Sequence, residues 1–239
     1  MNCLITGASL GIGYSLSLEM AKIGYNLFLT YYNNEELCNK LRDKIKKIYK
    51  VECIIQKCDL KKEEDIKKII LNFKDTLGNI DVLVNNASLS MDNLIDDKTK
   101  KEFMEVLEVN VVGTFLMTKY ASRIMNKNGI IINMASTDGI DTYSLYNIDY
   151  SVSKAGIIQL TKSLSLILTE IRVISVAPNW VDTESTREMN QNYLENELKR
   201  IGQKKLIKID TVVNKIIYII QNKNIKSGSI IRIEGEKNE

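Results

Sequence analysis

Short apolar stretches alternate with longer amphipathic stretches from one end of the chain to the other. The apolar stretches are rich in β-branched residues and mostly continuous, as expected for parallel strands covered by helices on both faces. Strands are predicted at residues 3–6, 26–31, 51–56, 81–85, 130–135, 172–177 and 229–233. Helices are predicted at residues 14–23, 35–49, 62–76, 100–126, 150–169, 190–201 and 210–221.

This regular order predicts an α/β fold with right-handed crossovers and a doubly wound, largely parallel, seven-stranded sheet. A length of 239 residues suits one such domain with a substantial core. The chain has one proline, Pro178, and no low-complexity stretch, so a single domain over residues 1–239 is expected. Ligands of such sheets bind beyond the carboxyl ends of the strands, where the strand order reverses.

Composition narrows the chemistry that this fold can carry. The chain contains no histidine, which excludes acid–base catalysis by an imidazole. Its four cysteines include no CxxC pair, so a zinc site lacks its usual ligands and no metal is predicted. The cysteines are therefore interpreted as reduced core residues, which is typical of a cytoplasmic protein.

Charge and hydropathy limit the classes of partner. The net charge of +3, from 33 basic and 30 acidic residues, favours neither a nucleic-acid nor a membrane partner. No segment reaches the apolar length of a membrane-spanning helix. No signal peptide is expected either, because the first predicted strand begins at residue 3.

A glycine-rich turn follows the first predicted strand and leads directly into a helix, reading TGASLGIG at residues 6–13. Gly7 permits the tight turn, Gly11 lets the backbone approach a pyrophosphate, and Gly13 lets helix and strand pack closely. The helix N-terminus would offer free N–H groups to the anion. An ordinary turn is the alternative, but the flanking strand and helix favour a Rossmann-type dinucleotide site. No Gly-Lys-Ser/Thr sequence follows, so a P-loop is rejected.

The end of the second predicted strand bears on the choice of cofactor. An NAD site usually places an acid there to bind the ribose 2′-hydroxyl, whereas this chain has Tyr31 and Tyr32. Glu35 and Glu36 come later and are interpreted as the first turn of the next helix. The missing acid favours NADP, although an Arg or Lys for its phosphate is also missing at this position, so NAD stays possible.

Polar residues end the third and fourth predicted strands as well. Asp59 follows the third strand and could either cap the next helix or bind adenine, and the sequence leaves both open. Residues 85–88 read NNAS and follow the fourth strand, where the chain would pass beneath a cofactor. As a simple turn, this asparagine-rich run would be unremarkable.

Tyr150 and Lys154 are four residues apart in one predicted helix, so their side chains share a face. An adjacent ammonium group is expected to lower the pKa of the tyrosine towards the range useful for acid–base catalysis. Such a pair is expected by chance in a chain this rich in tyrosine and lysine. The pair gains weight from its position after a strand that ends in Ser136, whose hydroxyl could bind the same carbonyl oxygen.

Taken together, these motifs resemble the classical short-chain dehydrogenase/reductase family, and most closely its 3-oxoacyl-acyl-carrier-protein reductases. The resemblance covers essentially the whole chain. Its motifs are TGASLGIG at 6–13, Asp59, NNAS at 85–88, VNVVGTF around Asn110, Ser136, YSVSK at 150–154, VAPNWVDT at 176–183 and SGSIIRIEG at 227–235.

The resemblance implies a role for each catalytic residue. Tyr150 would be the acid/base, and Lys154 would lower its pKa and bind the nicotinamide ribose. Ser136 would polarise the substrate carbonyl, and Asn110 would hold a water that passes protons from Lys154 to solvent. Asp59 would bind adenine, Thr183 would orient the carboxamide and Asn86 would line the cofactor cleft. The full implied cofactor set is Gly7, Ser9, Leu10, Gly11, Ile12, Gly13, Tyr31, Asp59, Leu60, Asn86, Ala87, Tyr150, Lys154, Pro178, Val181 and Thr183.

The chain departs from the family pattern at a few positions. Ser88 replaces a usual glycine and adds a side chain near the cofactor. Asn179 replaces the glycine of a usual Pro-Gly pair, and asparagine tolerates a left-handed backbone. Leu10 stands where NADP-binding relatives often carry arginine. The polar, irregular stretch 137–149 flanks the expected substrate cleft.

The resemblance implies carbonyl reduction, with a 3-oxoacyl thioester as the leading substrate and an acyl carrier protein as a potential partner. A sugar, polyol, steroid or other small ketone is the alternative substrate. A dinucleotide-binding sensor or scaffold without catalysis is a further alternative, and a methyltransferase a weaker one. The family is commonly tetrameric, so a homo-oligomer is expected, through helices 100–126 and 150–169.

Overall fold

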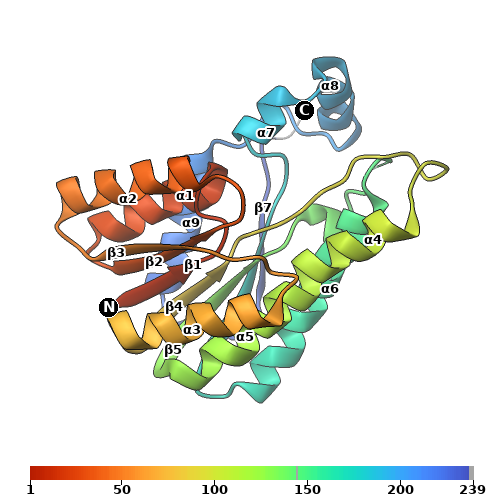
Figure 1. Cartoon of the computed structure of the whole chain (residues 1–239). Coiled ribbons are helices and arrows are strands. Elements are labelled where there is room, and N and C mark those ends of the chain that lie inside the picture. Colours follow the sequence, from red (N-terminus) through yellow and green to blue (C-terminus); the bar gives the residue numbers. More distant parts are fainter. Residues whose placement is uncertain (144, 237–239) are drawn as a thin grey trace.

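Seven parallel strands form one sheet in the order β3-β2-β1-β4-β5-β6-β7 (Figure 1). The predicted α/β fold with its seven-stranded parallel sheet is therefore confirmed. This computed structural model describes residues 1–143 and 145–236. Residue 144 of the predicted irregular stretch and the last three residues of the predicted domain lie outside the described residues. The strands are β1 Asn2–Ile5, β2 Asn26–Tyr31, β3 Cys53–Lys57, β4 Ile80–Asn85, β5 Met125–Met134, β6 Arg172–Pro178 and β7 Ile230–Ile233.

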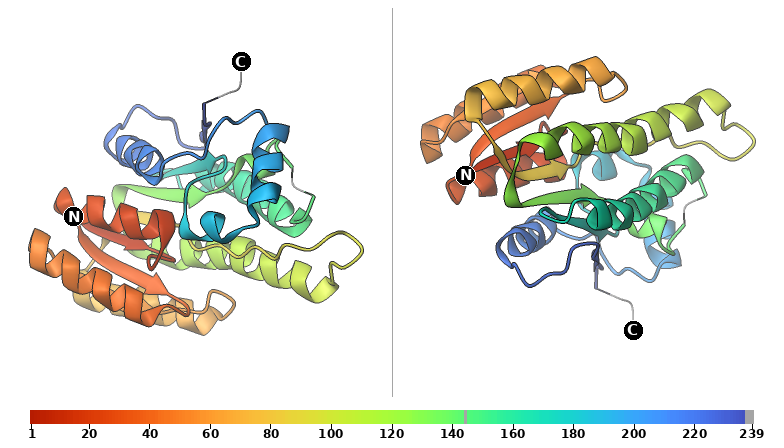
Figure 2. Two further views of the ribbon diagram at one scale, coloured as in Figure 1. Left: turned by 90° about the horizontal axis from the view of Figure 1, so that it is seen from above. Right: turned by 90° about the horizontal axis from the view of Figure 1, so that it is seen from below.

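Helices cover both faces of the sheet (Figures 1 and 2). One face carries α1 (Gly11–Lys22), α2 (Glu35–Tyr49) and α9 (Ile209–Gln221). The other carries α3 (Glu63–Leu77), α5 (Thr114–Ala121) and α6 (Ile148–Ile167). The remaining helical elements are α4 Lys100–Leu107, the π-helical segment η1 Glu108–Gly113, the 3₁₀ turns η2 Ser122–Ile124 and η3 Thr137–Gly139, α7 Glu184–Glu188 and α8 Gln191–Arg200.

Side chains of each strand alternate between two apolar cores. Leu4 and Phe28 pack under α3 and α5, whereas their neighbours Ile5 and Leu29 pack under α1, α2 and α9. Because both faces are buried, the strands consist of continuous apolar residues rather than alternating ones. This explains why the hydrophobic pattern locates the strands well.

The predicted helix 100–126 is wrong at its end and in its middle. The helix begins at Lys100 as predicted, but its α-helical hydrogen bonding changes to a π-helical pattern over Glu108–Gly113. It then ends at Ala121, and β5 already begins at Met125. Met125 pairs with Ile80, and the register then shifts before regular pairing resumes between Val82 and Ile130. A hydrophobic pattern does not reveal such a shift. The short helix α7 was not predicted, since five residues are too few for a periodic pattern.

Candidate active site

The order of the strands reverses beside β1, which pairs with β2 on one side and with β4 on the other. The turns that follow β1 and β4 are therefore neighbours at the carboxyl edge of the sheet. The amide of Asn86 donates to the carbonyl oxygens of Thr6 at 3.0 Å and Gly7 at 2.9 Å. The Thr6 hydroxyl accepts the N–H groups of Asn86 and Ala87, both at 3.0 Å. These bonds hold the glycine-rich turn at a fixed place against the end of β4.

Two glycines of this turn leave no room for a side chain. Gly7 has a φ of +64°, and a Cβ there would stand 2.8 Å from the Cα of Ala87. A Cβ on Gly13 would stand 2.6 Å from the Asn86 amide nitrogen and closer still to the Gly7 carbonyl oxygen. The tight-turn role of Gly7 and the packing role of Gly13 are thus confirmed.

The turn leads directly into a helix as predicted, but α1 begins at Gly11, three residues before the predicted start at residue 14. The first N–H groups of a helix have no partner within it. Leu10 occupies the cap position of α1 and makes no side-chain cap bond, so these N–H groups are not satisfied by the cap residue. One of them, the Gly11 N–H, donates to the Glu184 carboxylate at 3.1 Å. This helix end therefore already attracts an anionic oxygen in the protein itself, as the positive end of the helix dipole should.

Ser136, Tyr150 and Lys154 come together at the end of β5, as the sequence predicted. Ser136 caps η3 by accepting the N–H of Asp138 at 3.1 Å, and its hydroxyl lies close enough to Tyr150 to lower the pKa of the phenol. A Cβ on Gly139 would stand 2.5 Å from the backbone carbonyl carbon of Lys154. The absence of a side chain at Gly139 thus lets η3 pack directly on α6 and places Ser136 beside the tyrosine.

Lys154 is almost completely buried, with 3% of its surface exposed. Its ammonium nitrogen donates to the Met134 carbonyl oxygen at 2.7 Å and lies 5.1 Å from the centre of the Tyr150 ring. Burial lowers the pKa of Lys154 to about 7, against a smaller opposing effect of Asp138. The group can therefore exchange a proton near neutral pH.

Burial raises the pKa of Tyr150 well above its usual value, and the nearby Asp138 carboxylate raises it further. Hydrogen bonds from Ser136 and Ser88 act in the opposite direction but are outweighed. The predicted lowering of this pKa by Lys154 is therefore wrong for the chain alone. Removal of a phenolate from water raises its free energy by more than hydrogen bonds from its polar neighbours lower it. Tyr150 consequently carries its proton at neutral pH.

Asn110 lies in the π-helical segment η1 and is 1% exposed. Its amide nitrogen donates to the Leu89 carbonyl and to the Ser153 hydroxyl, both at 2.9 Å. Its amide oxygen accepts the Leu89 N–H at 2.7 Å. The π-helical turn points this side chain inward, which is a common use of such turns at functional sites. The predicted relay through a bound water stays a prediction.

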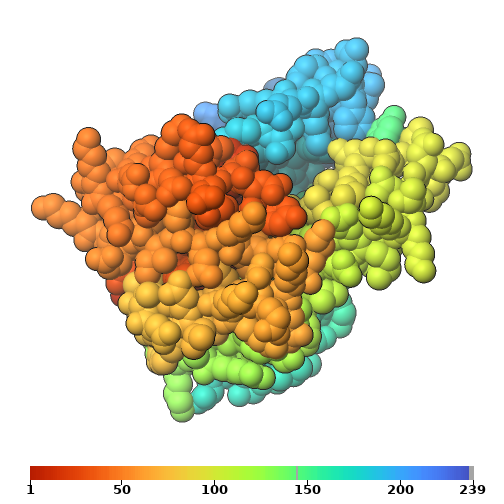
Figure 3. Space-filling view, viewed as in Figure 1, coloured from red at the N-terminus to blue at the C-terminus, as the bar shows by residue number. Residues whose placement is uncertain are grey.

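A cleft of about 260 Å³ opens above Ser136 and Tyr150. The surfaces of α7 and α8 (blue) and of the chain around α4 (olive) flank it in the space-filling view (Figure 3). Eight of the predicted site residues line it: Ile12, Asn86, Ser136, Tyr150, Lys154, Pro178, Val181 and Thr183. Further lining residues are Ser88, Ser90, Met134, Ala135, Asn147, Asn179, Trp180, Thr186 and Met189.

Two of these further residues received no role from the sequence. Trp180 and Met189 add apolar surface to the cleft, and Trp180 packs edge-on against Tyr193 of α8. They come from the segment between β6 and α8, whose path over the sheet no local pattern reveals. Asn179 also differs from expectation, because it is not among the described residues with a positive φ.

Other predicted cofactor residues lie outside the cleft. Tyr31, Asp59 and Leu60 are at the carboxyl ends of β2 and β3. The Asp59 carboxylate accepts the N–H of Lys61 at 3.1 Å in the turn before α3. The cap position of α3 is Lys62, without a side-chain cap bond, so the capping alternative is wrong, and binding of adenine stays a prediction. The sequence missed Lys57, which pairs in register with Tyr31 and lies 5.9 Å from the centre of the Tyr32 ring. This lysine brings a cation to the end of β2 from the neighbouring strand.

Within residues 1–143 and 145–236, no group of three or more acidic or cysteine side chains could hold a metal ion. The four cysteines are buried and unbridged, as predicted. In the same part of the chain, no helix combines the length and the apolar character that crossing a membrane requires.

Comparison with known proteins adds a family context. The family model for short chain dehydrogenase matches residues 1–194. A 3-oxoacyl-[acyl-carrier-protein] reductase of Staphylococcus epidermidis is 28% identical, covering 98% of this chain and 97% of that protein. The reductase of the same name from Thermotoga maritima is 30% identical, covering 98% and 96%.

Solved structures agree with the fold in detail. A dehydrogenase/reductase of Sinorhizobium meliloti superposes with a TM-score of 0.92 at 26% identity, covering 100% of this chain and 95% of that one. An actinorhodin polyketide ketoreductase variant with NADPH superposes with a TM-score of 0.88 at 26% identity, covering 98% and 95%.

Proposed function

The chain belongs to the short chain dehydrogenase family, and we propose that it uses NADPH to reduce the ketone of a 3-oxoacyl thioester to a secondary alcohol. As a family member it is an NAD(P)-dependent oxidoreductase that acts on carbonyl and alcohol groups. The observation that carries the proposal is the meeting of Ser136, Tyr150 and Lys154 at the floor of one cleft. The relatives named as 3-oxoacyl-[acyl-carrier-protein] reductases support the substrate class.

The residues around the glycine-rich turn fit a dinucleotide. Gly7 and Gly13 leave a backbone cradle that a Cβ would fill, and the α1 N-terminus presents N–H groups to a pyrophosphate. Lys57 beside Tyr32 supplies a cation for the 2′-phosphate of NADP, which the end of β2 lacks. Asp59 would face the adenine and Thr183 the carboxamide. When bound, the cofactor supplies the hydride.

The protein's own part is the handling of the carbonyl oxygen and its proton. Ser136 and Tyr150 line the cleft together, where each hydroxyl can donate one hydrogen bond to a developing oxyanion. Because the pKa of Tyr150 is raised, the phenol is protonated at neutral pH and can deliver its proton to that oxygen. Lys154, with a pKa of about 7, can then restore the proton. Asn110 would pass protons from Lys154 towards solvent.

We further expect the chain to be cytoplasmic and to form a homo-oligomer, a tetramer or a dimer. Exposed apolar side chains on the helices expected at the interface support this: Val112, Phe115, Ile148 and Val152. An acyl carrier protein is the expected partner, because it would deliver the thioester. A monomer in light scattering would contradict the oligomer.

A panel of ketones assayed in parallel with NADPH and NADH tests the proposed function. We expect acetoacetyl thioesters to be reduced, and faster with NADPH than with NADH. If thioesters give no detectable turnover while a sugar, polyol, steroid or other small ketone is reduced, that second substrate class replaces the first. Absence of turnover with every ketone, together with tight binding of NADPH, would favour a dinucleotide-binding sensor or scaffold.

A further inference from the structure

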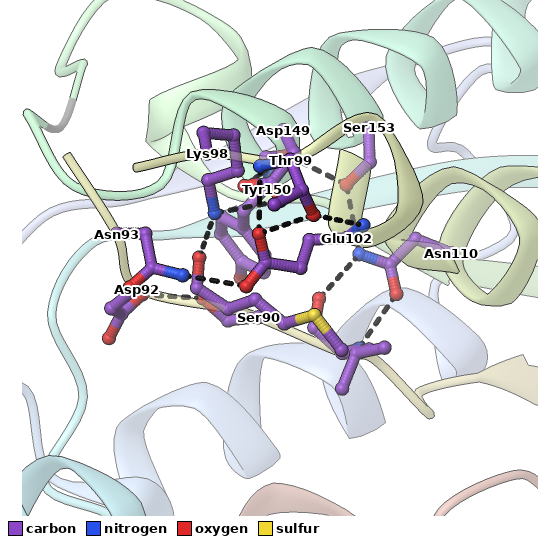
Figure 4. Close-up of polar contacts among 12 residues, drawn as sticks. Ser90, Asp92, Asn93, Lys98, Thr99, Glu102, Asn110, Asp149, Tyr150 and Ser153 are labelled. Atoms are coloured by element: carbon purple, nitrogen blue, oxygen red, sulfur yellow. Dashed lines mark hydrogen bonds and ion pairs between the residues drawn. The ribbon is translucent and has the colours of Figure 1, made fainter. Parts of the chain in front are cut away.

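A buried ion pair lies directly behind the catalytic tyrosine. The Lys98 ammonium nitrogen lies 3.0 Å from an Asp149 carboxylate oxygen, and the two side chains are only 3% and 0% exposed. Among the ion pairs of residues 1–143 and 145–236, no other has both side chains this buried. Asp149 immediately precedes Tyr150 in the first turn of α6 (Figure 4).

Asp149 completes the N-terminus of α6. The first N–H groups of a helix have no partner within it, and a cap side chain commonly accepts one of them. Asn147 occupies the cap position but makes no cap bond, and its side-chain oxygen has no hydrogen-bond partner among the described residues. The second Asp149 oxygen instead accepts the N–H of Tyr150 at 2.9 Å. The carboxylate thus holds the backbone of the catalytic residue itself.

Lys98 ties this carboxylate to the segment that joins β4 to α4, residues 86–99. The lysine comes from the end of that segment and also donates to the Met91 carbonyl oxygen within it. The Asn93 N–H donates to the Tyr146 carbonyl at 2.8 Å, a second connection between the segment and the chain before α6. Leu89 is held by Asn110, as described above. The segment is therefore fixed at both ends.

This segment brings Ser88 and Ser90 into the cleft that Tyr150 lines, and Ser88 lies close enough to Tyr150 to lower the pKa of its phenol. The position of the segment relative to α6 therefore sets the position of Ser88 relative to Tyr150. A buried ion pair is a weak source of stability, because desolvation of the two charges offsets their attraction. Its directional geometry can instead fix one arrangement of two packed elements.

We propose that Lys98 and Asp149 are positioning residues, whose ion pair fixes segment 86–99 against α6 and so aligns Tyr150 with Ser88 and Ser136. The proposal rests on the proposed function only in taking Tyr150 as the proton donor, whichever ketone is the substrate. Lys98 acts through Asp149, and Asp149 acts through the Tyr150 backbone. Neither side chain is required to touch substrate or cofactor.

Two double variants test the two bonds separately. Lys98→Met with Asp149→Asn removes both charges but keeps an oxygen that can accept the Tyr150 N–H. Lys98→Met with Asp149→Leu removes that oxygen as well. Changing both partners leaves no unpaired buried charge, so both proteins should fold. The matched control is Lys61→Met with Glu105→Gln, which removes a partly buried pair with a 2.6 Å contact that also involves α4.

The assay uses NADPH and any ketone that the wild-type protein reduces, so failure of the thioester substrate would not affect this test. We expect kcat to fall about tenfold in the asparagine variant and about 100-fold in the leucine variant, since misplacement by about 1 Å has effects of this size. The Kd for NADPH should change less than about twofold, and the control should keep the wild-type kcat. A wild-type kcat in the asparagine variant overturns the proposal, whatever the leucine variant does.

Hydrogen exchange of the wild-type protein tests the same idea if the variants do not fold. We expect the backbone amides of residues 89–97 and of the first turn of α6 to exchange at a common rate, because the ion pair makes them open as one unit. Independent opening of the two regions would overturn the proposal. In a folded asparagine variant, both regions should exchange faster than in the wild-type protein, and unchanged exchange there would count against it.

Discussion

Ser88 and Tyr150 line the same cleft, and the Ser88 hydroxyl lies close enough to the Tyr150 phenol to lower its pKa. Ser88 is the position at which the chain departs from the glycine of the family pattern. The Ser88 hydroxyl favours the ionised phenol, so it lowers the pKa of Tyr150 against the larger effect of burial. The serine at position 88 therefore places a second hydroxyl near Tyr150, in addition to that of Ser136.

Ser88→Gly should raise the pKa of Tyr150 further, because the phenolate loses a donor. Oxidation of the alcohol product needs an ionised acceptor, so its pH profile should shift to higher pH. We expect the oxidation rate at a fixed pH below the pKa to fall about 3- to 10-fold, the usual effect of one hydrogen bond. A pH series of alcohol oxidation with NADP⁺ measures this shift. An unchanged profile would show that Ser88 has no influence on the proton.

Tyr150→Phe should remove the proton donor while it keeps the aromatic ring and the other residues of the cofactor set. Loss of a general acid typically lowers kcat by about 10²- to 10⁴-fold. Binding of NADPH, followed by fluorescence titration, should stay within about threefold of the wild-type protein. Equal turnover by this variant would contradict the assignment of Tyr150, and loss of NADPH binding would show a structural defect instead.

The lowered pKa of Lys154 predicts a pH-dependent contribution to stability. Between pH 7 and about 10.5, the unfolded chain holds a proton on this amine that the folded chain has lost. The unfolded state thus binds more protons, so the free energy of unfolding rises with pH, by at most about 1.4 kcal/mol per pH unit. In Lys154→Met this rise should disappear. Urea unfolding of both proteins at pH 7, 8 and 9 measures the difference, and parallel pH profiles would exclude a depressed pKa.

Lys57→Gln should weaken the preference for NADPH. If the ammonium of Lys57 binds the 2′-phosphate, its loss removes a charge-assisted hydrogen bond that is worth about 1.5–3 kcal/mol, or about a tenfold or larger rise in the KM for NADPH. The KM for NADH should change little, because NADH lacks that phosphate. Lys44→Gln is a matched control, since Lys44 also lies over a tyrosine ring, 5.7 Å from the centre of Tyr14. An equal rise for both cofactors would contradict the assignment.

Local sequence patterns predicted most of the fold because their physical causes are local. The continuous apolar stretches mark strands buried on both faces, and the amphipathic stretches between them mark the covering helices. The prediction of one continuous helix at 100–126 was wrong, because hydrophobic patterns do not distinguish its middle and its end from an ordinary α-helix. A π-helical turn at Glu108–Gly113 preserves the apolar character of the helix, and the polar start of β5 resembles a helix end.

The meeting of the candidate catalytic residues was predictable because they stand at strand ends or share one helix face. Ser136 follows β5, and Tyr150 and Lys154 are four residues apart on α6, so chain connectivity alone nearly fixes their meeting. The protonation states of Tyr150 and Lys154 were not predictable. The raised pKa of Tyr150 depends on burial and on Asp138, and both are set by how η3 packs on α6.

The sequence by itself therefore determined the order of the elements, the glycine-rich turn and the identity of the Ser136, Tyr150 and Lys154 group. Tertiary structure alone decided which distant side chains meet. Lys57 reaches the end of β2 only because β2 and β3 pair in that register. Lys98 meets Asp149, 51 residues later, only because segment 86–99 folds onto α6. Contacts of this kind depend on packing between elements, and the spacing of residues within one element carries no record of them.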